Sequence, residues 1–245
     1  MAAVALVAGF VDAIAGGGGL LTVPALFAYG LAPHAAFGTN KAQSVAGSFT
    51  ALVRYWRAGR VDVALARRAF PLGLLGAVLG AFMQTRVSPA VLRPVALVLL
   101  IGAAVSTLVL GSRMASLRPS QPLATSTRRA LSLAFVIGAY DGFFGPGTGT
   151  FLIVGLVWLT GRDFLSASAD AKVVNFASNL GALGWFAAQG TVVWSLALAM
   201  AAGQMVGAFL GARTALKGQE KLVRAFVVGA ALLLALKVGY DTLSA

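Results

Sequence analysis

Two stretches of the sequence place one lysine and two small polar residues along a single helical face. The spacing is i, i+3 and i+7 in both, and the residues are Lys41, Ser44 and Ser48, then Lys172, Asn175 and Asn179. A buried ammonium group at the head of a polar stripe can replace the water that a small anion loses inside a membrane protein. The alternative is that each lysine extends its ammonium group to the lipid headgroups. Because the polar stripe continues along each helix, we favour an anion pocket.

Two glycine-rich stretches could offer backbone N–H groups to the same anion. Residues 16–19 are four consecutive glycines, and residues 145–149 read GPGTG. Each helical glycine costs about 1 kcal/mol relative to alanine, so both stretches should break a helix. The helix that resumes after each break would direct its first N–H groups at a ligand, and the residues are Gly17, Gly18 and Gly19, then Gly147, Thr148 and Gly149. The alternative is a hinge or a packing notch that touches no ligand.

Asp12 and Asp141 are two of only seven acidic residues, and both lie in apolar surroundings. Carboxylates inside a membrane are costly and often serve proton relays or ion pairs. One interpretation is that each carboxylate couples transport to a proton. The other, which we favour, is a structural role in capping freed N–H groups or neutralising a lysine. Tyr140 precedes Asp141 whereas Val11 precedes Asp12, so the two acids need not be equivalent.

The sequence offers no residue set for catalysis or for tight binding of a transition metal. It has no cysteine and one histidine, and it lacks a Ser–His–Asp set. The glycine stretches differ from a nucleotide-binding P-loop because no Gly-Lys-Ser/Thr follows them. We therefore predict that the protein is not an enzyme and uses no cofactor and no metal.

The composition predicts an all-α polytopic membrane protein. Hydrophobic residues make up 59% of the 245 positions and charged residues only 11%. The net charge of +12 comes mainly from loops between apolar runs, which indicates membrane topology and not nucleic-acid binding.

Eight apolar runs follow one another, and the glycine stretches break the first and the fifth. The runs cover roughly residues 2–31, 36–56, 64–85, 90–111, 130–160, 171–188, 191–212 and 222–243. Unbroken runs are long enough, or nearly so, to cross a hydrocarbon core of about 30 Å. The pieces of the broken runs, about 14 residues or roughly 21 Å each, suit half-helices better.

Small residues four positions apart predict close helix packing in the third and seventh runs. The residues are Gly76 and Gly80, then Gly203, Gly207 and Gly211. Gln204 is a polar exception on the second of these faces and could reach the pocket.

The two halves of the chain repeat each other. Asp12, Gly16 and Gly18 match residues 129 positions later, and after a two-residue insertion the offset becomes 131. At this second offset the pairs are Lys41 with Lys172, Gly59 with Gly190, Gly76 with Gly207, Gly80 with Gly211 and Arg93 with Arg224. We therefore predict a first membrane repeat over residues 1–111, a cytoplasmic linker over 112–129 and a second repeat over 130–245.

The positions of the basic residues favour inverted repeats. If every apolar run crosses once, ten basic residues face the cytoplasm and seven face outward. If each broken run enters and returns to the same side, fourteen basic residues face the cytoplasm and three face outward. Both counts leave out the two lysines of the polar stripes. Each half then consists of a broken helix pair, possibly re-entrant, plus three transmembrane helices, a plan that secondary transporters use repeatedly.

The chain resembles the TauE/SafE family of sulfite and organosulfonate exporters over essentially its whole length. The residues that carry the resemblance are GFVDAIAGGGGLLTVP at 9–24, GTNKAQS at 38–44 and the related stretch GAYDGFFGPGTG at 138–149. The resemblance implies a multi-pass protein of the bacterial inner membrane that transports sulfur-containing or related organic anions.

We therefore predict a secondary transporter that exports sulfite, an organosulfonate or a related organic anion by alternating access. The alternatives are an anion channel and a non-transporting membrane assembly factor. The expected partners are a small anion, a coupling proton or ion, the lipid bilayer and a second copy of the chain in a homodimer. The predicted substrate-binding residues are the two polar stripes, the two glycine stretches, Asn40 and Gln204.

Overall fold

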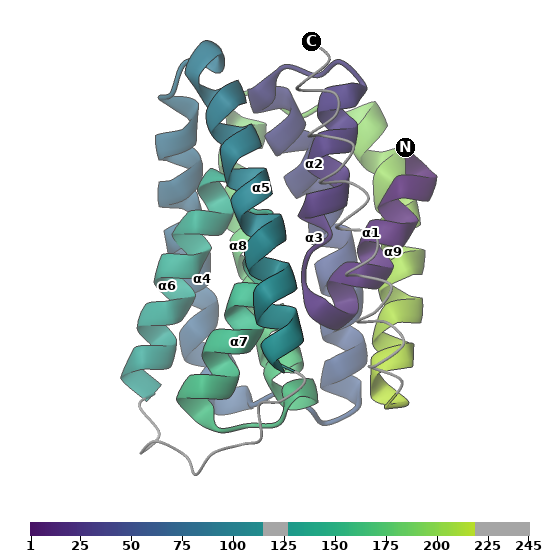
Figure 1. The fold of residues 1–245 in the computed structure, drawn as a ribbon, viewed down its shortest axis with the longest axis vertical. Coiled ribbons are helices and arrows are strands. Elements are labelled where there is room, and N and C mark those ends of the chain that lie inside the picture. Colours follow the sequence, from purple (N-terminus) through teal and green to yellow (C-terminus); the bar gives the residue numbers. More distant parts are fainter. Residues whose placement is uncertain (115–126, 219–245) are drawn as a thin grey trace.

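The computed structural model describes residues 1–114 and 127–218, and within these ranges the chain is helical without a strand (Figure 1). The helices are α1 (Ala2–Ala15), α2 (Gly19–Ala28), α3 (Pro33–Arg57), α4 (Val63–Thr85), α5 (Pro89–Met114), α6 (Thr127–Phe143), α7 (Thr148–Thr160), α8 (Phe164–Ala188) and α9 (Trp194–Leu216). The predicted eighth apolar run, 222–243, and most of the linker lie outside the described residues.

Each glycine-broken run forms two helices, as predicted. Gly16, Gly145 and Gly147 have φ values of 67°, 96° and 86°, a left-handed conformation that glycine adopts without steric cost. In Figure 1, α1 and α2 run in opposite directions and meet inside the molecule, and so do α6 and α7. The hairpin of α1 and α2 opens towards the upper end of the view, and the hairpin of α6 and α7 opens towards the lower end.

The unbroken runs that lie in the described ranges form single helices. α8 begins earlier than predicted, at Phe164, because the Asp163 side chain accepts hydrogen bonds from the backbone N–H groups of Leu165 and Ser166, both at 3.1 Å. Partial burial would raise the pKa of Asp163, but these hydrogen bonds and the nearby Arg60 outweigh it and lower the pKa.

Three of the described helices are long and apolar enough to cross a membrane, namely α4, the Pro89–Thr107 part of α5, and α9. α3 and α8 are also long, with 25 residues each, but they carry the polar stripes. Both pack against each other and against α4 or α9, so their polar faces lie inside the bundle. The outer helices therefore supply the apolar surface, and the central pair supplies the polar interior.

Glycines on α4 and α9 allow close helix packing, as predicted. Gly76 and Gly80 face the backbone of α6, and Gly203, Gly207 and Gly211 face the backbone of α1. A Cβ atom at any of these positions would overlap a carbonyl oxygen of the neighbouring helix. α4 and α9 thus hold the first helix of each hairpin at backbone contact, a packing mode that lipid-embedded helices favour.

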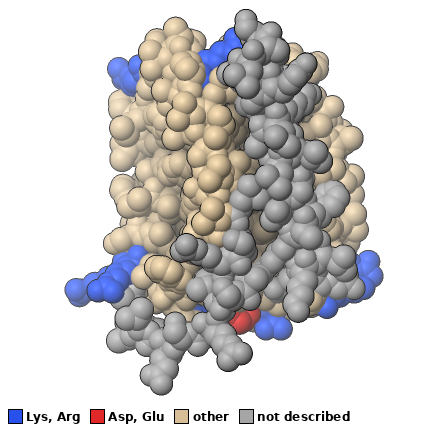
Figure 2. All heavy atoms as spheres, in the orientation of Figure 1, with Lys and Arg blue, Asp and Glu red and all other residues tan. Residues whose placement is uncertain are grey.

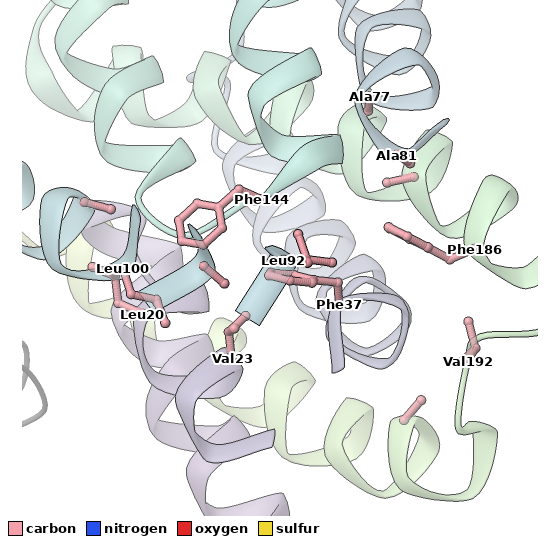
Figure 3. Packing of buried hydrophobic residues seen from close by; sticks show 14 of the residues in the cluster. Leu20, Val23, Phe37, Ala77, Ala81, Leu92, Leu100, Phe144, Phe186 and Val192 are labelled. Carbon is pink, nitrogen blue, oxygen red and sulfur yellow. The ribbon is translucent and has the colours of Figure 1, made fainter. Parts of the chain in front are cut away.

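A large apolar cluster packs around Phe37, in the part of α3 that precedes Lys41 (Figure 3). The Phe37 ring lies at its centre, 5.8 Å from the Phe27 ring and 5.9 Å from the Phe144 ring. The cluster draws on α2, α5 and α8 as well, and its labelled members include Leu20, Val23, Leu92, Leu100 and Phe186. Since Phe37 lies one helical turn before Lys41, the cluster fixes where this lysine begins its polar stripe.

Candidate functional site

A small polar cavity of about 20 Å³ lies where the two glycine breaks meet α3 and α8. Its lining is formed by Asp12, Gly17, Gly18, Gly19, Asn40, Lys41, Ser44, Asp141, Gly145, Gly147, Thr148, Gly149, Asn175, Asn179 and Gln204. This volume holds a water molecule but not an organic anion. The predicted site residues all line it except Lys172 and Ser48.

Lys41 is buried beside a carboxylate from the other half of the chain. Its Nζ lies 2.7 Å from Asp141 Oδ1, and the two side chains are 2% and 3% exposed. The Asp141 carboxylate also accepts hydrogen bonds from the Thr148 hydroxyl at 2.9 Å and the Ser178 hydroxyl at 2.5 Å. A buried ion pair persists only when further hydrogen bonds satisfy its polar atoms, and these two hydroxyls do so.

Lys172 forms the corresponding pair with Asp12. Its Nζ lies 2.7 Å from Asp12 Oδ2, and it also donates to the Asp12 backbone oxygen. The Lys172 side chain is fully buried behind Asp12, which explains why it does not line the cavity. Neither lysine reaches the surface, so the alternative in which their ammonium groups extend to the lipid headgroups does not hold in this structure.

The tips of the two hairpins cross at backbone contact. A Cβ atom at Gly16 would overlap the Cα and carbonyl carbon of Gly149. The Thr150 hydroxyl donates to the backbone oxygens of Ala15 and Gly16, and the Tyr55 hydroxyl donates to that of Ala13 at 2.9 Å. Side chains thereby satisfy carbonyl groups that the end of α1 leaves free inside the membrane.

The resumed helices begin at the cavity. α2 begins at Gly19 and α7 at Thr148, so the positive end of each helix dipole faces the polar interior. The backbone N–H groups of Gly17 and Gly18 donate to Asp12 Oδ1 at 3.3 and 3.5 Å. The first glycine stretch therefore provides backbone donors at the cavity, where the Asp12 carboxylate is their present acceptor.

The remaining predicted residues differ in how they meet the cavity. Ser48 donates to the Ser44 backbone oxygen at 2.7 Å within its own helix and does not line the cavity. Asn179 donates to Asn175 at 2.8 Å. Gln204 reaches the lining from α9, and its buried Oε1 has no hydrogen-bond partner in the described structure.

Two residues of the site were not predicted from the sequence. Gly145 lines the cavity, and its match to Gly16 was the available signal. Ser178 holds Asp141 from α8, but it lies outside the i, i+3, i+7 stripe, so no pattern indicated it.

A separate ion pair joins Arg162, in the α7–α8 connection, to Asp170 of α8. Arg162 donates to the Asp170 carboxylate and, at 3.0 Å, to the Arg60 backbone oxygen. The Asp62 N–H donates to the same carboxylate at 2.8 Å. These bonds hold the α3–α4 connection against the α7–α8 connection.

The equivalent contact in the other half is neutral. At the offset of 131, Asp170 corresponds to Thr39 and Asp62 to Val193, and the Val193 N–H donates to the Thr39 hydroxyl at 3.0 Å. The two ends of the molecule are therefore held by related contacts of different strength, since charged hydrogen bonds are the stronger kind.

Comparison with known proteins shows similarity along nearly the whole chain. The family profile described as "Sulfite exporter TauE/SafE" matches residues 1–238. The "Probable membrane transporter protein ORF9" of Sinorhizobium sp is 39% identical over 246 residues, which cover 97% of this chain and 90% of that protein. The "Probable membrane transporter protein YfcA" of Escherichia coli strain K12 is 36% identical over 245 residues, with coverages of 98% and 88%.

A "Probable membrane transporter protein" of Haemophilus influenzae is 36% identical over 241 residues, covering 97% of this chain and 92% of that protein. No solved structure matches the chain. The profile match, these relatives and the apolar helices lead to one conclusion: the chain is a membrane protein that belongs to the TauE/SafE family of transporters.

Proposed function

We propose that the protein is a secondary transporter that exports sulfite, an organosulfonate or a related organic anion across the inner membrane. The observation that carries the proposal is the pair of buried lysines, Lys41 and Lys172, beside a cavity where two helices begin. Fixed cations and aimed N–H groups are what a small oxyanion needs in place of its hydration shell. The sulfur-containing substrate and the export direction follow the description of the family.

The arrangement of the two hairpins favours inverted repeats and, with them, alternating access. The two hairpins open towards opposite ends of the molecule in Figure 1, and α4 packs on α6 as α9 packs on α1. Each ion pair at the cavity joins one half to the other. A rocking motion of one half against the other would therefore act on both pairs at once.

We place the linker, 112–129, in the cytoplasm on the basis of the basic residues. Figure 2 shows Lys and Arg side chains gathered at the lower end and a smaller group at the upper end. The lower end includes Arg54, Arg57 and Arg60, close to where α3 ends. Loops rich in arginine and lysine stay on the cytoplasmic side.

Single cysteines at equivalent positions test this topology, because the chain has no cysteine of its own. Ala58 and Gln189 follow α3 and α8, are both exposed, and are 131 positions apart. In intact cells, an impermeant thiol reagent should label Gln189→Cys directly and Ala58→Cys only after permeabilisation. Labelling of both variants from the same side would contradict inverted halves.

Transport itself is tested in proteoliposomes with sulfite, thiosulfate, methanesulfonate and acetate. We expect saturable uptake of at least one labelled sulfur anion, accelerated when the same unlabelled anion fills the vesicles. Anion currents without this counterflow would indicate a channel, and the absence of both flux and binding would indicate an assembly factor.

A further inference from the structure

The two intramembrane aspartates occupy equivalent sequence positions but unequal surroundings. Asp141 is 3% exposed and has three side-chain donors within 2.9 Å, from Lys41, Thr148 and Ser178. If Lys41 moved away, the carboxylate would keep the short hydrogen bond from Ser178. The Thr148 hydroxyl, which also lies 2.6 Å from the Gly145 backbone oxygen, is a second donor within reach. Asp141 therefore has hydrogen-bond partners besides its lysine.

Asp12 depends much more on its lysine. Its side chain is 16% exposed, and beyond Lys172 its donors are longer, namely Gly17 N at 3.3 Å, Gly18 N at 3.5 Å and Asn175 Nδ2 at 3.4 Å. Hydrogen bonds of this length are weak. Without Lys172, the Asp12 carboxylate would keep only these long hydrogen bonds and the charge of Lys41, which is paired with Asp141.

The inequality has a cause in the sequence. At the repeat offsets, Thr148 corresponds to Gly19 and Ser178 corresponds to Gly47, so the first half lacks both hydroxyl groups. The space beside Gly47 is occupied by the Gln204 side chain, whose Cδ and Nε2 would lie 3.0 Å from a Cβ atom there. No hydroxyl group replaces the missing donors at these two positions.

Asp12 also stands between the cavity and Lys172. Asp12 lines the cavity, whereas Lys172 is fully buried behind it. An incoming anion therefore meets a negative carboxylate first and reaches the Lys172 ammonium group only when Asp12 releases it. A proton on Asp12 removes the repulsion and the ion pair together, because a neutral carboxyl group neither repels an anion nor holds a lysine.

The charged groups around Asp12 balance in the empty site. Within residues 1–114 and 127–218, its charged neighbours are Lys172 from α8, Lys41 from α3 and Asp141 from α6, and with Asp12 these four charges sum to zero. Tyr55 of α3 donates its hydroxyl to the backbone of Ala13. α2 and α7 carry no titratable side chain, and the one on α9, Arg213, is exposed near the end of that helix.

A bound monoanion would leave this cluster with one uncompensated negative charge in a low-dielectric interior, which is costly. We propose that Asp12 is the site of a coupling proton: its carboxylate takes one proton from the aqueous solution on the side where a monoanion enters and binds Lys172, and releases it to the solution on the side where the anion leaves. This inference rests on the proposed anion transport and names its coupling partner.

Transport of a monoanion is then electroneutral, because one proton travels with each anion. The anion gradient and the pH gradient drive the flux, and the membrane potential does not. An anion that accumulates in the cytoplasm leaves together with a proton. The apparent affinity should rise as pH falls, by up to tenfold per pH unit while Asp12 is ionised in the empty protein.

The test is calorimetric binding of methanesulfonate to the purified protein in buffers of different ionisation enthalpy. Methanesulfonate is a monoanion at every accessible pH, so any proton taken up belongs to the protein. We expect about one proton per bound anion and a Kd that weakens by up to tenfold per unit of rising pH. Binding without proton uptake would overturn the inference and leave the proposed transport intact. If methanesulfonate does not bind at any pH, the inference is overturned for sulfonates. Transport is tested separately by the proteoliposome assay with sulfite, thiosulfate, methanesulfonate and acetate.

Two variants assign the proton to Asp12. Asp12→Asn should bind methanesulfonate with no proton uptake and with little dependence on pH. Asp12→Glu, which keeps a titratable group, should still take up about one proton per anion. If Asp12→Asn keeps the proton uptake, the assignment is wrong. The wild-type measurement requires no variant to fold.

Discussion

Replacement of Lys41 by glutamine is expected to weaken anion binding at least tenfold, which corresponds to about 1.4 kcal/mol. The ammonium group lines the cavity, and no other cation does so in the described structure. Its loss also leaves the Asp141 carboxylate buried without its cation, so the negative charge faces the incoming anion directly. Binding isotherms with the sulfur anion that is transported best measure the effect.

The same substitution should destabilise the protein, since removal of one partner from a buried ion pair costs about 3 kcal/mol or more. A double variant, Lys41→Gln with Asp141→Asn, separates the two effects. It removes both charges, so it should regain most of the melting temperature and still bind anions poorly. Arg57→Gln, an exposed residue at the end of α3, is the matched control and should change neither property. Anion binding by the double variant at the wild-type affinity would remove Lys41 from the site.

Adjacent glycines at the first break should respond very differently to alanine. Gly16 has a φ of 67°, and its Cβ atom would overlap the backbone of Gly149 where the hairpins cross. A left-handed alanine costs about 1 kcal/mol and overpacking typically adds 1–3 kcal/mol. Gly16→Ala should therefore lower the melting temperature in detergent by about 5 °C or more.

Gly17→Ala is the control for this comparison. Gly17 does not have a positive φ, and the nearest atom to an added Cβ would be Leu20 Cδ1 at 3.7 Å, an ordinary contact. We expect its melting temperature to stay close to that of the wild type. Equal losses in the two variants would show that the breaks are sensitive to any side chain and that the crossing contact has no special role.

Much of the candidate site could be predicted because its residues carry local signals. A lysine followed by small polar residues on one helical face marks a polar interior in an apolar run, and four glycines mark a helix break. Both signals occur in each half of the sequence at nearly the same offset, which chance alone would rarely produce. α3 and the two breaks consequently appear where the sequence indicated, and α8 contains the predicted run but begins earlier, at Phe164.

Which residues pair with one another in the site could not be predicted in the same way. The sequence indicated that the two acids need not be equivalent, but it did not show how they differ. In the structure, hydroxyl groups hold Asp141, whereas Asp12 depends on Lys172. The lysine alternatives also remained open, because a helical face shows the same pattern whether it meets lipid headgroups or a buried carboxylate. Contact with another helix decides between them.

The sequence by itself determined a membrane protein of two related halves, with broken helices and two polar stripes, because composition and periodicity act over a few helical turns. Only the tertiary structure decided which charges meet. Lys172 pairs with Asp12 across 160 positions, and both lysine–aspartate pairs at the cavity join one half to the other. Such pairs depend on how the hairpins enter the bundle and on the glycines that let backbones touch, and no spacing along one helix encodes them.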